Sequence, residues 1–182
     1  MTASVFIDGE AGTTGLGIRE RLQHVKGITI KSIDPDKRKD PKARQALMAE
    51  VDAVVLCLPD DAAIEAVKLA DELGANAPRI LDASTAHRVA HGWVYGFAEL
   101  HPTQRDMIEG AHRVANPGCY PTGGIALIRP LVDAGFILPS YPVTVNAVSG
   151  YSGGGKSMIE SYEAGTAPHF ELYGLGLTHK HL

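Results

Sequence analysis

Cysteine, basic charge and long apolar runs are all scarce in this sequence, and each scarcity excludes a class of protein. The 182 residues contain two cysteines, Cys57 and Cys119, too few for a fold held together by disulfides. Acidic residues exceed basic ones, 21 to 17, so the net charge of −4 argues against a general nucleic-acid-binding surface. No apolar run approaches the roughly 20 residues that cross a membrane. Residues 1–8 lack the basic and apolar regions of a secretion signal, so we expect a cytoplasmic protein without membrane or nucleic-acid partners.

The first feature that is present is a glycine-rich turn between a strand and a helix. Residues 5–8 form a short apolar run, GEAGTTG follows at 9–15, and apolar residues then recur at helical spacing from Leu16. This order presents backbone N–H groups to a pyrophosphate. The spacing is G-x-x-G-x-x-G rather than G-x-G-x-x-G, so a plain strand-to-helix turn stays an alternative. The residues predicted to contact a dinucleotide are Gly9, Gly12, Thr13, Thr14 and Gly15.

The end of the second predicted strand, residues 28–33, carries two conflicting signals. Asp34 stands where an acidic residue often binds the ribose hydroxyls of NAD. Lys37 and Arg38 follow within four residues and would suit the 2′-phosphate of NADP. Solvated surface charge explains the basic residues equally well, so the residues alone decide between neither cofactor.

Strand and helix patterns then alternate to about residue 88. The expected elements are helices over 42–50 and after Pro59, with strands over 51–58 and 79–85. This alternation predicts an α/β fold with a Rossmann-like, doubly wound parallel sheet. Ligands of such sheets bind beyond the carboxyl ends of the strands. We therefore expect residues 9–15, Pro59, 84–88 and Cys119 to share one edge of the sheet.

Apolar patterns also predict which side chains are buried in this half. Cys57 lies in the apolar run VVLCL at 54–58 and is expected to be a buried strand residue. In the helix that follows, Ile64, Val67 and Leu69 are expected to face the core.

A second site is indicated by residues 116–123, NPGCYPTG. Pro117 and Gly118 do not continue a regular element, and Pro121 suits the first turn of a helix, whose apolar residues recur from 125 to 132. Cys119 is therefore predicted at a helix N-terminus, where the helix dipole favours the thiolate that attacks a carbonyl. A structural cysteine in a proline and glycine turn is the alternative.

The last part of the chain offers weaker signals. Residues 141–148 alternate like a strand of a different layer, and GYSGGGKS at 150–157 matches a phosphate-loop pattern before a predicted helix over 158–164. Too few residues follow for the rest of a phosphate-loop domain, which favours a glycine loop whose Lys156 attracts an anionic group. His179 and His181 share one strand face. No further ligand cluster supports a metal site, so one of them is expected to exchange protons with Cys119.

Six blocks occur in an order that resembles the N-acetyl-γ-glutamyl-phosphate reductases in their shorter bacterial form. The blocks are GEAGTTG, DASTAHR, YGFAEL, NPGCYPTG, SGYSGGGK and HKHL. The resemblance implies NADPH-dependent reduction of N-acetyl-glutamyl 5-phosphate to the 5-semialdehyde, with release of phosphate, in arginine biosynthesis. Cys119 would form a thioester, and His181, favoured over His179, would move protons. The family's use of NADPH favours Lys37 and Arg38 as ligands of the 2′-phosphate.

The resemblance also implies substrate contacts and a division into domains. The expected substrate contacts are Ser84, Arg88, Ser149 and Lys156, with Asn116 orienting the substrate or the oxyanion. Residues 1–115 would bind NADP, and residues 116–182 would begin an α+β catalytic domain that is incomplete, because family members continue further. We expect this chain to expose apolar surface, to be inactive or unstable alone, and to form a homo-oligomer. The alternatives are an aspartate-semialdehyde dehydrogenase and a non-catalytic nucleotide-binding fragment.

Overall fold

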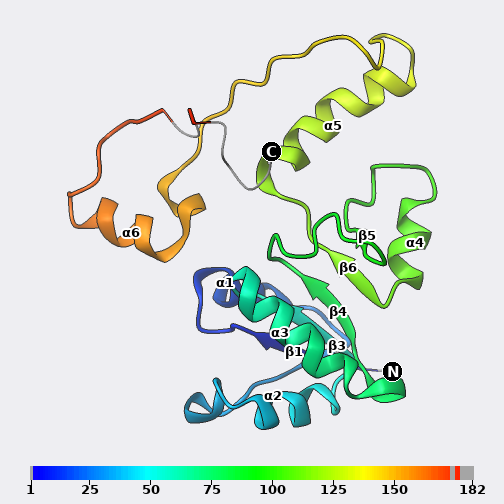
Figure 1. The fold of residues 1–182 in the computed structure, drawn as a ribbon, viewed down its shortest axis with the longest axis vertical. Helices are drawn as coiled ribbons and strands as arrows, with labels where there is room; N and C mark the ends of the chain where they lie inside the picture. Colours follow the sequence, from blue (N-terminus) through cyan, green and yellow to red (C-terminus); the bar gives the residue numbers. More distant parts are fainter. Residues whose placement is uncertain (1, 173–174, 177–182) are drawn as a thin grey trace. The chain divides into compact units, whose positions relative to one another are not determined.

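The computed structural model describes residues 2–172 and 175–176, and the chain divides into two units, Met1–Val145 and Asn146–Leu182. The first unit contains β1 (Ala3–Asp8), α1 (Thr13–Leu22), β2 (Ile28–Lys31), η1 (Pro35–Lys37), α2 (Pro41–Met48), β3 (Ala53–Leu56), α3 (Asp60–Asp71), η2 (Gly74–Asn76), β4 (Arg79–Asp82), β5 (Val94–Tyr95), α4 (Gln104–Gly110), β6 (Arg113–Ala115) and α5 (Cys119–Asp133) (Figure 1). The second unit contains η3 (Tyr151–Gly154) and α6 (Gly155–Glu163).

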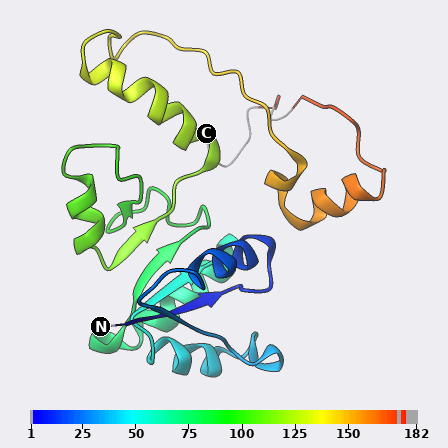
Figure 2. The ribbon, with the colours of Figure 1, turned by 180° about the vertical axis from the view of Figure 1, so that it is seen from behind.

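The first unit is built on a six-stranded sheet in the order β2-β1-β3-β4-β6-β5, and every pairing in it is parallel. The chain passes from β1 to β2 on one side and then crosses to β3 on the other side of β1. Right-handed crossovers in opposite directions place α1 on one face of the sheet and α2 and α3 on the other. Figure 1 looks onto α3, and Figure 2, from behind, looks onto α1. The predicted doubly wound sheet is confirmed.

The main core lies between the sheet and helices α2 and α3. Phe6, Val54 and Ile80 are paired across β1, β3 and β4 and are buried on the same face. From α3 they meet fully buried alanines at positions 63, 66 and 70, whose small side chains let the helix approach the sheet closely. The prediction for Ile64 was wrong, since its side chain is 39% exposed.

Two predicted strand boundaries also differ from the structure. The strand expected over 51–58 is shorter, so Cys57 lies just beyond the end of β3 and is half-buried. The strand expected over 141–148 was wrong, because those residues adopt neither helix nor strand. A strand needs a neighbour to pair its backbone groups, and this segment pairs with none of the strands in the described part of the chain.

Apolar side chains around α5 are open to solvent in this unit. Leu127, Phe136 and Leu138 are each exposed by two thirds or more. This agrees with the expectation that the chain exposes apolar surface. In the second unit, the rings of Tyr151 and Tyr162 stack with centroids 4.2 Å apart and join η3 to α6. Among the described residues, no helix combines the length and apolar character needed to cross a membrane.

Candidate active site

The carboxyl ends of five strands form one row across the sheet. Asp8, Leu56, Asp82 and Ala115 are successive partners in the register, and Tyr95 pairs with Ala115 at the edge. The loops that follow these residues therefore begin on one edge. Residues 9–12, 57–59, 83–88 and 116–118 are among them, so the predicted shared edge is confirmed. The reversal of strand order lies between β1 and β3, and this is where open α/β sheets bind ligands.

The glycine turn after β1 is packed tightly against the loop after β3. Gly9 has φ of +90°, and a Cβ there would lie 2.2 Å from the carbonyl oxygen of Cys57. A Cβ on Gly15 would lie 2.3 Å from the carbonyl oxygen of Gly9. Only glycine fits at either position, and the turn lies close to the sheet edge as a result.

The start of α1 offers backbone donors at this turn. Gly12 is the N-cap of α1, and no side chain among the described residues caps the first turn, which contains the exposed Thr13 and Thr14. The N–H groups of an uncapped first turn suit the charge of a phosphate. The turn therefore fits the diphosphate of a dinucleotide.

Beyond β2, Asp34, the acidic residue considered as a ribose ligand, accepts a hydrogen bond from the main chain nearby. The carboxylate of Asp34 accepts a hydrogen bond of 3.1 Å from the N–H of Asp36 and caps η1, while Lys37 and Arg38 are exposed. A cation that sequence reasoning missed also lies here. Arg19 of α1 donates to the hydroxyl of Ser32 at 2.7 Å and pairs with Glu10 in the glycine turn.

A buried ion pair lies directly before the glycine turn. Asp8 and Arg44 of α2 are 4% and 6% exposed, and Nε and Nη2 of Arg44 donate to Oδ2 of Asp8 at 3.0 and 2.7 Å. Burial raises the pKa of Asp8, and the bonds and charge of Arg44 oppose that rise. The pair fixes α2 to the end of β1.

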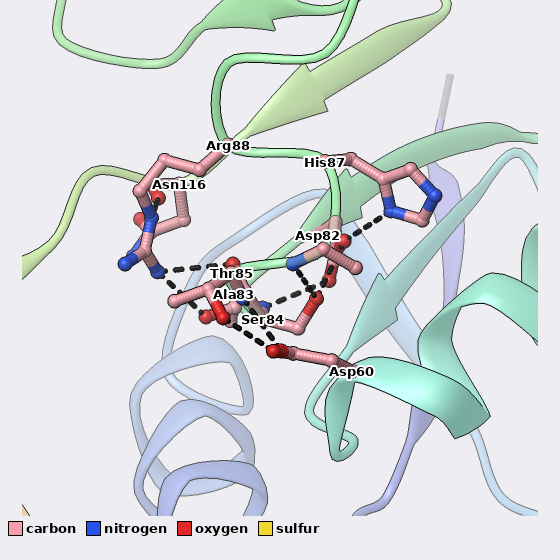
Figure 3. Close-up of polar contacts among 9 residues, drawn as sticks. Asp60, Asp82, Ala83, Ser84, Thr85, His87, Arg88 and Asn116 are labelled. Carbon is pink, nitrogen blue, oxygen red and sulfur yellow. Dashed lines mark hydrogen bonds and ion pairs between the residues drawn. The ribbon is translucent and has the colours of Figure 1, made fainter. Parts of the chain in front are cut away.

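The next carboxylate in the row organises the loop after β4. Asp82 is fully buried and accepts from the N–H and hydroxyl of Ser84, both at 2.8 Å. Nδ1 of His87 lies 2.6 Å from Oδ2 of Asp82, and the imidazole stacks on Trp93 with centroids 4.4 Å apart. Figure 3 shows His87 and Arg88 directed to opposite sides of this loop. The hydroxyl of Ser84, a predicted substrate contact, is thus bound within the loop.

Further bonds join the same loop to α3 and to the turn before Cys119 (Figure 3). Asp60 at the start of α3 accepts from the N–H and hydroxyl of Thr85 at 2.9 and 2.5 Å. Arg88 donates from Nη2 to the carbonyls of Ala83 and Ser84 at 3.2 and 3.0 Å. Its Nε donates to the carbonyl of Asn116 at 3.0 Å. The structure therefore brings Ser84, Arg88 and Asn116 together.

Cys119 is the first residue of α5, as its sequence context predicts, and the structure shows that it is exposed. Gly118 is the N-cap, and its carbonyl accepts from the N–H and the hydroxyl of Thr122 at 3.0 and 2.7 Å. No side chain among the described residues caps this helix start. Cys119 thus combines exposure with the positive end of a helix dipole, an arrangement that suits a nucleophilic thiolate.

We expect iodoacetamide to modify Cys119 well before Cys57 at neutral pH. Only thiolates react. Burial, followed by the nearby charges of Asp8 and Asp82, raises the pKa of Cys57 to about 11, so Cys57 stays protonated. Its labelling should rise about tenfold per pH unit in mildly alkaline buffer, because the thiolate fraction grows at that rate below the pKa. Peptide mass spectrometry over time measures both sites, and equal rates at neutral pH would contradict this expectation.

The remaining predicted residues lie outside the first unit. Ser149 and Lys156 belong to the second unit, where exposed Lys156 pairs with Glu160 at 3.5 Å. In the described residues, the segment directly before the glycine loop, 141–149, forms no strand, so the phosphate-loop hypothesis lacks the strand that it requires. His179 and His181 lie outside the described residues. Within the described ranges, no cluster of histidine, cysteine and carboxylate side chains could hold a metal ion.

The parallel sheet and its glycine turn define a nucleotide-binding α/β domain of the Rossmann type. The family described as "Semialdehyde dehydrogenase, NAD binding domain" matches residues 7–108, and "Semialdehyde dehydrogenase, dimerisation domain" matches residues 119–182. The chain belongs to the semialdehyde dehydrogenase family.

Among curated relatives, the chain is similar to N-acetyl-gamma-glutamyl-phosphate reductases. It is 54% identical to that of Chelativorans sp. (strain BNC1), over 100% of this chain and 58% of the relative. It is 53% identical to that of Rhizobium meliloti (strain 1021), over 100% of this chain and 60% of the relative. The chain thus spans about three fifths of the length of these relatives.

Solved structures share the fold at low sequence identity. The aspartate semialdehyde dehydrogenase of Francisella tularensis superposes with a TM-score of 0.67 at 14% identity, over 88% of this chain and 48% of the other. The Candida albicans enzyme, solved with NADP, gives 0.56 at 14% identity, over 74% and 48%. At such identity, the likeness describes the fold alone.

Proposed function

We propose that the chain carries the dinucleotide-binding and nucleophile parts of an N-acetyl-γ-glutamyl-phosphate reductase. The reaction is NADPH-dependent reduction of N-acetyl-glutamyl 5-phosphate to the 5-semialdehyde, with release of phosphate, in arginine biosynthesis. The observation that carries the proposal is an exposed Cys119 at a helix N-terminus, following a strand that ends on the same edge as the glycine turn. The names of relatives that are 53–54% identical support the choice of substrate.

In the proposed mechanism, the Cys119 thiolate attacks the acyl carbon of the substrate. The bond from that carbon to the phosphate oxygen breaks, phosphate leaves with the electron pair, and a thioester remains on Sγ. Backbone N–H groups at the start of α5 stabilise the oxyanion, and Asn116 orients it. When bound, the nicotinamide cofactor supplies a hydride to the thioester carbon. The carbon–sulfur bond then breaks as the aldehyde carbonyl forms. His181, rather than His179, exchanges the proton with the sulfur of Cys119.

The proposed cofactor contacts follow the geometry of the glycine turn. Residues 9–15 and Pro59 hold the dinucleotide, and Lys37 and Arg38 bind the 2′-phosphate. The preference for NADPH over NADH is supported by Lys37 and Arg38, which are exposed beside the end of β2.

The remaining proposals concern the substrate and the assembly. The proposed contacts with the substrate's carboxylate or phosphate are Ser84, Arg88, Ser149 and Lys156. Arg88 would make its contact besides the bonds of its guanidinium to main-chain carbonyls, and lysine would act as a point charge. The dinucleotide-binding domain would comprise residues 1–115, with the catalytic domain beginning at 116. The protein would be a cytoplasmic homo-oligomer, and the match to a dimerisation domain supports that assembly.

The reaction is tested by offering two acyl phosphates in turn. Loss of the reduced-cofactor absorbance, with N-acetyl-glutamyl phosphate and NADPH, measures any turnover. In the absence of cofactor, mass spectrometry should detect an acyl adduct on the peptide that contains Cys119. Aspartyl phosphate is the matched control, because it carries the same reactive group on a shorter chain without the acetyl group. An adduct formed only from aspartyl phosphate would favour aspartate-semialdehyde dehydrogenase, and no adduct from either would refute the nucleophile.

A further inference from the structure

We propose that Arg88 is a positioning residue, which holds the turn before Cys119 against the loop after β4. The inference rests on the proposed role of Cys119 as nucleophile. Regular pairing between β4 and β6 ends where the N–H of Asn116 donates to the carbonyl of Asp82 at 2.7 Å. Beyond that point, the guanidinium of Arg88 bonds the carbonyls of Ala83 and Ser84 on one segment and that of Asn116 on the other. It continues the connection between the two segments where the strand ladder stops.

This connection depends on the shape of arginine. Nε and Nη2 lie on one planar fork and donate in fixed directions, Nη2 to the carbonyl of Ser84, four residues before Arg88, and Nε to that of Asn116, 28 residues after it. A lysine ammonium keeps the charge but offers a single point with freely rotating donors. Three carbonyl dipoles converging on one cation also make charge-assisted bonds, which are stronger than neutral ones. Replacement by lysine should therefore keep the charge and lose the geometry.

Gly118 gives a second, independent indication. Its φ of −72° is one that any residue adopts, so the backbone conformation does not require glycine. Space is tight, because a Cβ would lie 3.1 Å from Nη1 of Arg88 and 3.3 Å from Cδ of Pro121, so either neighbour would have to move by a few tenths of an ångström. The guanidinium therefore packs against the residue that immediately precedes the nucleophile.

Arg88 itself projects from a rigid loop. Asp60 holds Thr85 from the start of α3, and the buried Asp82 holds Ser84 and His87. Asp82 is the last residue of β4 and Asp60 follows β3, and both strands end on the edge proposed to bind the dinucleotide. Through Arg88, the turn before Cys119 is therefore held by the same part of the sheet that would bind the cofactor.

The test measures Cys119 reactivity without substrate or cofactor. Iodoacetamide labelling is followed by mass spectrometry across a pH series in the wild type, Arg88→Met and Arg88→Lys. We expect both substitutions to slow labelling of Cys119 by roughly tenfold at neutral pH, because the turn that carries the sulfur loses the bonds that hold it. A residue that only contacts substrate would change KM for the acyl phosphate and leave this labelling profile unchanged.

Two further variants keep the result interpretable. Arg79→Lys is the matched control, because Arg79 also donates to three main-chain carbonyls, those of Ile108, Glu109 and Ala111 at the end of α4. It should leave the Cys119 profile unchanged. Gly118→Ala presses a methyl group against the guanidinium without removing its charge. It should slow Cys119 labelling in the same direction as Arg88→Lys and by a smaller factor, even where Arg88→Met fails to fold.

The outcomes separate the inference from the proposed function. A wild-type Cys119 that labels faster than a free thiol, with Arg88→Lys and Gly118→Ala unchanged, would overturn the positioning role and leave the nucleophile in place. Equal effects of Arg79→Lys and Arg88→Lys would also overturn it, since the loss would then be general. A wild-type Cys119 that labels like a free thiol would overturn the activated nucleophile itself.

Discussion

Replacement of Cys119 by serine is expected to abolish acyl-adduct formation and to lower reductase turnover by at least about a thousandfold. A serine hydroxyl is a far weaker nucleophile than a thiolate, and a helix N-terminus alone does not ionise it. Binding of the dinucleotide should be unchanged, because the glycine turn belongs to β1 and α1 and Cys119 to α5. Mass spectrometry measures the adduct, and a fluorescence titration with NADPH measures binding.

The matched control is Cys57→Ser, which removes the other thiol of the chain. Cys57 lies beside the glycine turn, and burial keeps it protonated, so it should contribute nothing to the adduct. Full adduct formation by Cys119→Ser would show that another residue is the nucleophile. Dinucleotide binding without any adduct, in the wild type as well as the variant, would favour a non-catalytic nucleotide-binding fragment.

The fold was predictable because its signals are local in sequence. Apolar strands followed by helical spacing predict each strand and helix separately, and the handedness of crossovers allows few arrangements beyond the observed one. Residues 9–15 and 116–123 were predictable for the same reason. Glycine and proline restrict or permit backbone conformations without help from distant residues.

The predictions that were wrong concern residues whose burial or strand pairing depends on a partner distant in sequence. The apolar pattern predicted that Ile64 faces the core. In the structure, the alanines of α3 pack against the sheet instead, and Ile64 is partly exposed. Residues 141–148 alternate like a strand, but alternation does not supply the neighbouring strand. Neither helical spacing nor alternation predicts which side chains are buried unless the element that packs against them is known.

The bonds that shape the site were invisible for a related reason. Asp82 and His87 are close in sequence, and DASTAHR could have suggested their contact. The contacts of Arg88 with Asn116 and of Asp8 with Arg44 join residues 28 and 36 positions apart. One sequence has no signal for such pairs. A buried charge at the end of an apolar strand is the available hint, because it requires a partner.

Replacement of Arg44 by methionine is expected to lower the free energy of unfolding by about 3–5 kcal/mol at neutral pH. The substitution keeps an unbranched side chain in the buried position and leaves the carboxylate of Asp8 without its counter-ion. Glu65, whose Oε2 lies 4.0 Å from Nη1 of Arg44, would add repulsion. Denaturant titration of wild type and variant measures the difference.

The loss of unfolding free energy caused by Arg44→Met should also depend on pH. Burial already raises the pKa of Asp8 above its ordinary 3.8, and losing Arg44 removes the groups that oppose the rise. Between the unfolded and the raised pKa, the folded state binds more protons than the unfolded state, so stability falls as pH rises through that interval. The deficit of Arg44→Met should therefore be largest at neutral pH and should shrink as the pH is lowered toward 3.8.

Arg129→Met is the matched control, because Arg129 pairs with Asp133 on the exposed surface of α5 and should cost less than about 1 kcal/mol. The double variant Asp8→Asn/Arg44→Met leaves no buried charge, so it should be more stable at neutral pH than Arg44→Met alone and lose the pH dependence. A pH-independent deficit, or one equal to that of Arg129→Met, would show that the pair does not hold α2 to the strand end beneath the glycine turn.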